Sequence, residues 1–369
     1  MKIEDSVLRN DEKAVFELRS LYSKYGYSRY RMSKFEEYDL YVRNKDFLIS
    51  DNIITFTDTD GKQMALKPDV TLSIIKNSKN GADVEKLYYN ENVYRVSKGS
   101  HAFKEIMQVG LECIGNSDDY SLYEVIYLAA MSLKTISENF VLDVSNLAVI
   151  SDILLNMGVS EEAEKEILKC IGEKNAHGIA EICKKENVSG DALCRLVSLY
   201  GEPSKVIPEL YKLLPEETEA LKKLKEITFA LEDAGLKGKI NIDFSVINDM
   251  NYYNGFVFRG FIEGIATGIL SGGQYDKLMQ KMGKKQEAVG FAVYLDSLYA
   301  LSENNAEYDV DDVILYDDDC DIKSVSDTVK LFTQDGKSVT ALKTVPSELR
   351  YKRLLKMNER GVEIIENRA

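Results

Sequence analysis

The chain has 369 residues, of which 44% are apolar and 29% charged, a composition typical of a globular protein with two or three domains. No run of about 18 apolar residues occurs, so no membrane-spanning helix is expected. The 61 acidic residues outnumber the 47 basic ones and give a formal charge of -14. Because binding to nucleic acid usually requires a basic surface, this charge argues against nucleic acid as the main partner.

Histidine and cysteine are sparse, and their spacing predicts neither a metal site nor a disulfide framework. The two histidines, His101 and His177, are far apart, and the five cysteines are scattered. We therefore expect no metal and no cofactor. Reduced thiols and an acidic, polar N-terminus also predict a cytoplasmic protein.

The first 300 residues mix helical and strand patterns. Apolar spacing predicts an amphipathic helix over 11–26, with Val15, Leu18 and Tyr22 on one stripe. Alternation and turn signals then predict a strand over 53–57, a turn at Asp60-Gly61, a hairpin with strands at about 86–95 and 104–115, and a helix over 122–136. Short Leu-, Lys- and Glu-rich helices over about 150–235 indicate a helical insertion, and strands return at 239–244 and 255–258.

An acidic stretch at 302–312 indicates a linker to a small C-terminal α/β unit. The elements predicted there are a strand over 313–316, a helix over 322–332, a strand over 338–342, a helix over 348–357 and a strand over 362–365. We therefore expect a main domain over 1–303 and a second domain over 306–369.

Two short segments carry candidate binding residues, each with a simpler alternative. Asp69 and Thr71 would together accept hydrogen bonds from an ammonium group, or either would cap the helix that follows. In strand geometry Gln108, Gly110 and Glu112 share one face, which leaves space for a small polar ligand or forms a solvated sheet face. Spacing alone leaves both questions open.

The third candidate is the pair Tyr252-Tyr253, which precedes the turn Asn254-Gly255. A tyrosine hydroxyl would bind an imidazole or an amide, although tyrosine is common in this chain and is often part of a core. The Gly272-Gly273 pair would let a ligand or a neighbouring strand approach closely, but two adjacent glycines are a weak signal.

Taken together, five segments resemble histidyl-tRNA synthetases, because they occur in the order and approximate spacing seen in that family. They are 66–71, 95–112, 248–255, 272–276 and 290–298, and the resemblance covers roughly residues 10–300. It implies a class II aminoacyl-tRNA synthetase-like α+β fold, in which helices flank an antiparallel sheet, and a dimer.

The resemblance also implies an amino-acid pocket. Asp69, in place of the family's longer glutamate, and Thr71 would hold the amino group of histidine, while Glu112 and Tyr253 would hold the imidazole. Arg95 matches an arginine that contacts the α-phosphate. The implied histidine-binding set is Asp69, Thr71, Arg95, Gln108, Glu112, Tyr252 and Tyr253.

The nucleotide half of the site departs from the synthetase pattern. Asn248, Gln274 and Ser297 stand where the family has arginines, and Ser97 replaces a glutamate. Removing a single stabiliser of transition-state charge often costs about 2.7–4 kcal/mol. We therefore expect no catalytic residues and no aminoacylation.

A kept amino-acid pocket beside a lost nucleotide site is similar to the regulatory subunits of ATP phosphoribosyltransferase, which are synthetase paralogues. That resemblance implies a short catalytic subunit as partner, in a hetero-octamer, self-association as a dimer, and L-histidine as feedback inhibitor. Two alternatives are a working histidyl-tRNA synthetase with unusual ATP contacts and an assembly protein that binds no ligand.

Overall fold

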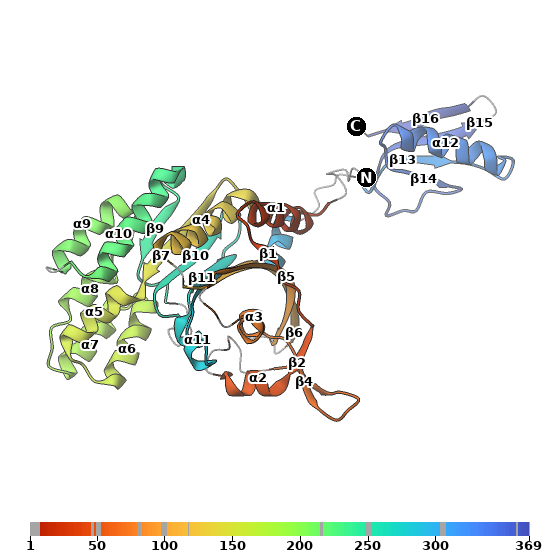
Figure 1. The fold of residues 1–369 in the computed structure, drawn as a ribbon. Coiled ribbons are helices and arrows are strands. Elements are labelled where there is room, and N and C mark those ends of the chain that lie inside the picture. The colour runs from red at the N-terminus through yellow and green to blue at the C-terminus, as the bar shows by residue number, and fades with distance from the viewer. Residues whose placement is uncertain are drawn as a thin grey trace. The chain divides into compact units, whose positions relative to one another are not determined.

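The computed structural model describes residues 8–45, 48, 53–79, 81, 83–96, 102–116, 118–214, 217–247, 253–302, 308–358 and 361–368. The chain divides into two compact units, Met1–Leu301 and Ser302–Ala369, drawn in Figure 1. Each has a hydrophobic core of its own.

The larger unit is built on a nine-stranded sheet of order β1-β5-β6-β12-β11-β10-β7-β9-β8. Neighbours from β5 to β7 are antiparallel, whereas β1 runs parallel to β5 and β9 parallel to β7. The strands are β1 (Ser28–Arg29), β5 (Glu85–Val96), β6 (Phe103–Gly115), β12 (Glu287–Tyr294), β11 (Leu270–Gln274), β10 (Phe256–Ile262), β7 (Phe140–Asn146), β9 (Ile240–Asp243) and β8 (Tyr200–Gly201). The predicted sheet and the predicted hairpin, formed by β5 and β6, are confirmed.

Helices cover both faces of this sheet. On one face lie α1 (Asn10–Lys24), which buries Val15, Leu18 and Tyr22 as predicted, and α4 (Asp119–Ile136), which packs against β7, β10 and β12. On the other face a second core includes residues of three short helices. They are α2 (Tyr38–Arg43), α3 (Thr71–Asn77) and α11 (Asp276–Lys281). A small sheet of β2 (Phe35–Glu37), β4 (Gln63–Leu66) and β3 (Thr55–Thr57) joins this second layer.

The helical insertion follows β7. It comprises α5 (Leu147–Met157), α6 (Glu161–Gly172), α7 (Ala176–Lys185), α8 (Asp191–Leu196), α9 (Pro203–Leu213) and α10 (Glu219–Leu231) (Figure 1). Several of these helices begin at a side-chain cap: Ser160 accepts a hydrogen bond from the Ala163 N–H, and Thr218 accepts one from the Leu221 N–H. A turn over Glu232–Leu236, in which Gly235 has a φ of 89°, then leads into β9.

The smaller unit is a mixed sheet of order β14-β13-β15-β16 with one long helix. Its elements are β13 (Val310–Leu315), α12 (Ile322–Gln334), β14 (Val339–Leu342), β15 (Tyr351–Asn358) and β16 (Gly361–Asn367).

The predicted helix over 348–357 is wrong, because this segment forms β15 between β13 and β16. Leu, Lys, Arg and Met favour helices in isolation, but pairing with two strands overrides that preference. The burial pattern shows the two-residue period of a strand, since Leu355 and Met357 are buried while Lys352 and Lys356 are exposed.

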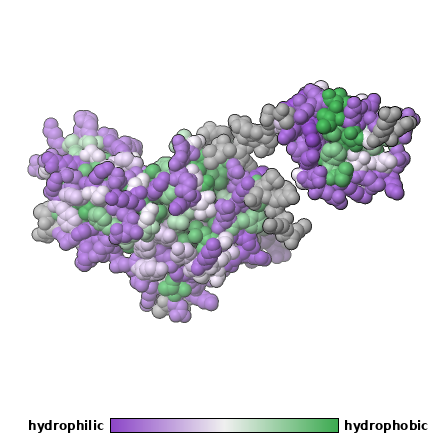
Figure 2. Space-filling model, turned by 90° about the horizontal axis from the view of Figure 1, so that it is seen from above, coloured by the Kyte–Doolittle hydropathy of each residue, from purple (hydrophilic) through white to green (hydrophobic). Residues whose placement is uncertain are grey.

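The smaller unit exposes several large apolar side chains. Ile322 is 89% exposed, Leu331 61%, Ile364 55% and Ile365 54%. Figure 2 shows hydrophobic residues gathered on the face of this unit turned toward the viewer. Its buried core is correspondingly small. Among the described residues of the whole chain, every helix is too short or too polar to span a bilayer.

Candidate functional site

Between Met107 and Cys113, strand β6 carries polar residues on one face and apolar residues on the other. Gln108 and Glu112 are buried, with exposed fractions of 3% and 2%, while Val109 and Leu111 belong to the core beneath α4. The predicted alternation is confirmed, and the alternative of a solvated sheet face is wrong. The polar face of β6 is therefore a buried site.

Glu112 is the centre of this site. The Thr71 hydroxyl donates to Glu112 Oε1 at 2.8 Å, and the Tyr275 hydroxyl donates to Oε2 at 2.6 Å. Burial raises the pKa of Glu112 to about 8, although both hydrogen bonds lower it, and the nearby charge of Asp69 raises it further. Glu112 therefore holds its proton more tightly than an exposed glutamate does.

Two glycines make room for the polar groups of this face. Gly290 of β12 lies opposite Glu112, and a Cβ atom on it would stand 1.7 Å from Glu112 Oε2. Gly110 lies opposite Tyr89, and a Cβ atom there would stand 2.4 Å from the Tyr89 hydroxyl. Burial, chiefly, raises the pKa of Tyr89, and the charge of Glu112 adds to that effect. Close approach of side chains therefore requires glycine on two adjacent strands.

The N-terminal end of α3 brings the first candidate pair to this face. Asp69 Oδ1 accepts a hydrogen bond from the Leu72 N–H at 3.0 Å, so the helix-cap alternative holds for Asp69. Burial raises the pKa of Asp69, while the Arg95 guanidinium opposes this rise. Arg95 itself donates from Nε to the Pro68 carbonyl at 2.9 Å.

Tyr253 completes the group. It is half-buried, and burial is the main reason that its pKa is raised well above the usual value, with the charges of Glu112 and Asp69 contributing. The structure thus brings together five predicted residues, namely Asp69, Thr71, Arg95, Glu112 and Tyr253. Gln108 lies on the same strand face, and its Nε2 is buried with no hydrogen-bond partner among the described residues. The seventh, Tyr252, lies outside the described residues.

Sequence reasoning missed two further side chains of the site, Tyr275 and Tyr89. It also missed the burial of Lys67, which lies two residues before Asp69. Tyr275 follows the Gly272-Gly273 pair in a segment that already carried the resemblance, so a signal for it existed. Lys67 is fully buried, with Nζ 2.6 Å from Glu91 Oε2. No sequence signal predicts the burial of Lys67, because lysine is usually exposed and its partner Glu91 lies 24 residues away in the chain.

Two of the positions where the synthetase resemblance implies an arginine are described. Gln274 Oε1 accepts a hydrogen bond from the Phe256 N–H at 2.9 Å, so this amide joins β11 to β10. Ser297 is half-buried in the 3-10 helix Leu295–Ser302. The other substituted positions, Ser97 and Asn248, lie outside the described residues.

Comparison with known proteins identifies the family. A family model described as histidyl-tRNA synthetase matches residues 4–298. A relative named ATP phosphoribosyltransferase regulatory subunit, from Caldanaerobacter subterraneus subsp. tengcongensis, is 31% identical and aligns with 75% of each chain. The chain belongs to the family of ATP phosphoribosyltransferase regulatory subunits. A relative of the same name from Clostridium acetobutylicum is 28% identical over 90% of this chain and 85% of its own.

Solved structures show the same fold. A chain titled ATP phosphoribosyltransferase regulatory subunit/histidyl-tRNA synthetase, from Bacillus halodurans C, has a TM-score of 0.73 at 24% identity and covers 94% of this chain and 93% of its own. A chain of an ATP phosphoribosyl transferase complex from Thermotoga maritima has a TM-score of 0.63 at 18% identity, and the match covers 77% of this chain and 97% of that one. The predicted class II synthetase-like fold is confirmed.

Proposed function

We propose that this chain is a non-catalytic regulatory subunit of ATP phosphoribosyltransferase in histidine biosynthesis. It would activate a short catalytic subunit and confer feedback inhibition by L-histidine. Family membership supports the role, and the related Thermotoga maritima chain comes from a complex of that transferase. The observation that carries the proposal is a buried Glu112 site beside a neutral Gln274 that is already hydrogen-bonded within the sheet.

The site supplies the groups that histidine would need. The imidazole would lie between Glu112 and Tyr253, and its ammonium group would meet Asp69 and Thr71. Gln108 adds a buried amide donor whose Nε2 has no partner in the described part of the chain. An unsatisfied buried donor costs about 1–3 kcal/mol, which a ligand oxygen or ring nitrogen would recover.

For adenylate formation, the site would lack the cations that stabilise the negative charge of a reacting triphosphate. Gln274 and Ser297 are uncharged, and the cations of the described site are engaged. Lys67 is paired with Glu91, and Arg95 donates to the Pro68 carbonyl and faces Asp69. We therefore propose that aminoacylation is lost and that no tRNA is bound.

Regulation requires that histidine bind the inhibited arrangement of the complex more tightly than the active one. The partner would be a short catalytic subunit in a hetero-octamer, in which this chain also pairs with itself. Histidine bound at Glu112 would then act at a distance from the chemistry, through the interface between the two kinds of subunit.

The test is reconstitution of the full chain with its short catalytic subunit, followed by transferase assays over a range of L-histidine concentrations. We expect Glu112→Gln to keep the activation and to raise the histidine concentration for half-inhibition at least about tenfold, since a charge-assisted hydrogen bond is lost. Glu166→Gln, an exposed carboxylate on α6, is the matched control and should change neither.

Three other outcomes would contradict the proposal. Unchanged inhibition in Glu112→Gln would indicate an assembly protein that binds no histidine at this site. Histidine-dependent exchange between pyrophosphate and ATP by the isolated chain would indicate a working synthetase. No activation of the catalytic subunit by the wild-type chain would remove the regulatory role itself.

A further inference from the structure

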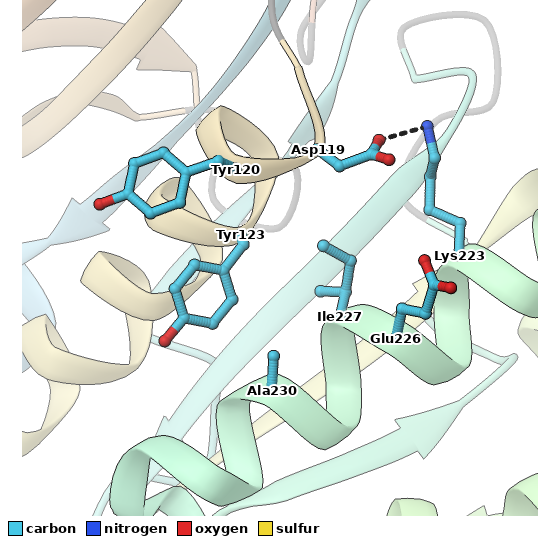
Figure 3. Close-up of a pocket in the computed structure, with 7 residues that line it drawn as sticks. All are labelled: Asp119, Tyr120, Tyr123, Lys223, Glu226, Ile227 and Ala230. Carbon is cyan, nitrogen blue, oxygen red and sulfur yellow. Dashed lines mark ion pairs between the residues drawn. The ribbon is translucent and has the colours of Figure 1, made fainter.

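A groove separates α4 from α10, on the opposite side of the sheet from Glu112. It has a cavity volume of about 340 Å³ and is open to solvent. Its lining residues, which we call the tyrosine groove, are Asp119, Tyr120, Tyr123, Lys223, Glu226, Ile227 and Ala230 (Figure 3).

Aromatic rings form one wall of the groove. The ring centroids of Tyr120 and Tyr123 are 6.1 Å apart, and Tyr123 stacks on Tyr127 at 5.9 Å with an interplanar angle of 23°. Tyr25, the residue that follows α1, extends the row, with its ring centroid 6.2 Å from that of Tyr127. Tyr120 is 60% exposed, so ring surface faces water. Tyr25, Tyr123 and Tyr127 are half-buried. Tyrosines that keep part of their ring at the surface are enriched in recognition surfaces.

The opposite wall is apolar at its base and charged at its rim. Figure 3 shows Ile227 and Ala230 of α10 facing the two tyrosines. At one end Lys223 Nζ lies 2.6 Å from Asp119 Oδ1, so these two charges neutralise each other. The exposed carboxylate of Glu226 makes no hydrogen bond or ion pair with any residue that the structure describes. Among the described residues, Glu226 is therefore a groove charge without an ion-pair partner, and Figure 3 shows its carboxylate at the Lys223 end of the groove, across Ile227 from the two tyrosines.

We propose that the tyrosine groove binds an arginine side chain of a partner protein. A guanidinium is planar and weakly hydrated, so it would stack on Tyr120 or Tyr123 while its N–H groups donate to Glu226. Its aliphatic stem would cover Ile227. A neutral or acidic side chain would leave the Glu226 carboxylate unpaired, so charge complementarity selects a cation.

The test uses the full chain with its tyrosine rings isotope-labelled for NMR, and N-acetyl-L-arginine amide as the probe. Tyr120→Phe and Tyr123→Phe assign the two resonances. We expect arginine amide to shift both, whereas N-acetyl-L-citrulline amide, a neutral molecule of nearly the same shape, binds at least about twofold to fivefold more weakly.

Two substitutions locate the contact. Glu226→Gln and Tyr123→Leu should each weaken the probe by about twofold to fivefold, and Glu166→Gln should leave it unchanged. Circular dichroism confirms that each variant is folded. The proposal is overturned if citrulline amide binds as tightly, if Glu226→Gln has no effect, if the shifts fall on other tyrosines, or if a neutral proline-rich peptide binds more tightly than arginine amide.

Discussion

The Glu112 carboxylate occupies the space above Gly290 on the neighbouring strand. A Cβ atom on residue 290 would stand 1.7 Å from Glu112 Oε2 and 2.5 Å from the Leu111 carbonyl oxygen. The second contact is to backbone, which cannot turn aside. The position of the central carboxylate therefore depends on the absence of a side chain from β12.

Gly290→Ala should displace Glu112 from its hydrogen bonds with Thr71 and Tyr275. Overpacking of this kind typically costs about 1–3 kcal/mol, so urea unfolding should show a loss of that size. The affinity for L-histidine, measured by calorimetry, should fall in the same variant. Gly172→Ala is the control, because nothing lies within 4 Å of a Cβ there, and it should not destabilise the chain. Unchanged histidine affinity in Gly290→Ala would refute the role given to Glu112.

Glu112 should make the stability of the chain depend on pH. In the unfolded chain the pKa of a glutamate is about 4.3, whereas burial raises the pKa of Glu112 to about 8 in the folded chain. Between these values the folded state holds the extra proton, so the free energy of unfolding falls as pH rises, by up to about 1.4 kcal/mol per unit.

Glu112→Gln removes that proton and isolates its contribution. The measurement is the difference in unfolding free energy between wild type and variant, from urea unfolding at a series of pH values. The unfolding free energy of the wild type minus that of the variant should fall as pH rises from about 5 to about 8, and should stay constant above that range. A difference independent of pH would mean that Glu112 is ionised throughout.

Histidine affinity should pass through a maximum between about pH 6.5 and pH 8. A bound imidazole and Glu112 share one proton. Below about pH 6.5 the imidazole of free histidine and Glu112 are both protonated, so one proton must leave on binding. Above about pH 8 neither group is protonated, so one proton must be taken up on binding. Affinity should fall about tenfold per pH unit on each side, as calorimetry would show. In Glu112→Gln the fall above pH 8 should weaken, and its persistence unchanged would assign it to another group.

Restoring charge at one nucleotide position should not restore adenylate formation. Gln274→Arg would leave the buried Phe256 N–H without its 2.9 Å acceptor, which should cost about 1–3 kcal/mol. Ser297 would remain uncharged in the single variant, and Asn248 would remain uncharged in the double variant as well. Pyrophosphate exchange should stay at background in Gln274→Arg and in Gln274→Arg combined with Ser297→Arg, and measurable exchange in either would show that the nucleotide site survives.

Patterns local in sequence predicted local structure well. The alternation around Gly110 placed Gln108 and Glu112 on one face, and the apolar stripe of residues 11–26 predicted α1, because each pattern depends only on the period of its own element. The segment 348–357 failed for the opposite reason. Its helix-favouring residues form a strand because β13 and β16 pair with it.

The hydrogen bond between Tyr275 and Glu112 joins residues 163 positions apart, and no spacing rule predicts such a contact. The burial of Lys67 against Glu91 depends in the same way on strands meeting in three dimensions.

By itself, the amino-acid sequence determined which chemical groups are present, the order of the segments that carry them, and the absence of arginine at positions such as Gln274. Only the tertiary structure decided that Glu112 is buried, that its pKa is raised to about 8, and that the Gln274 amide is bound to β10. The reason is physical: burial and charge stabilisation depend on neighbours in space, and folding brings those neighbours from strands and helices far apart along the chain.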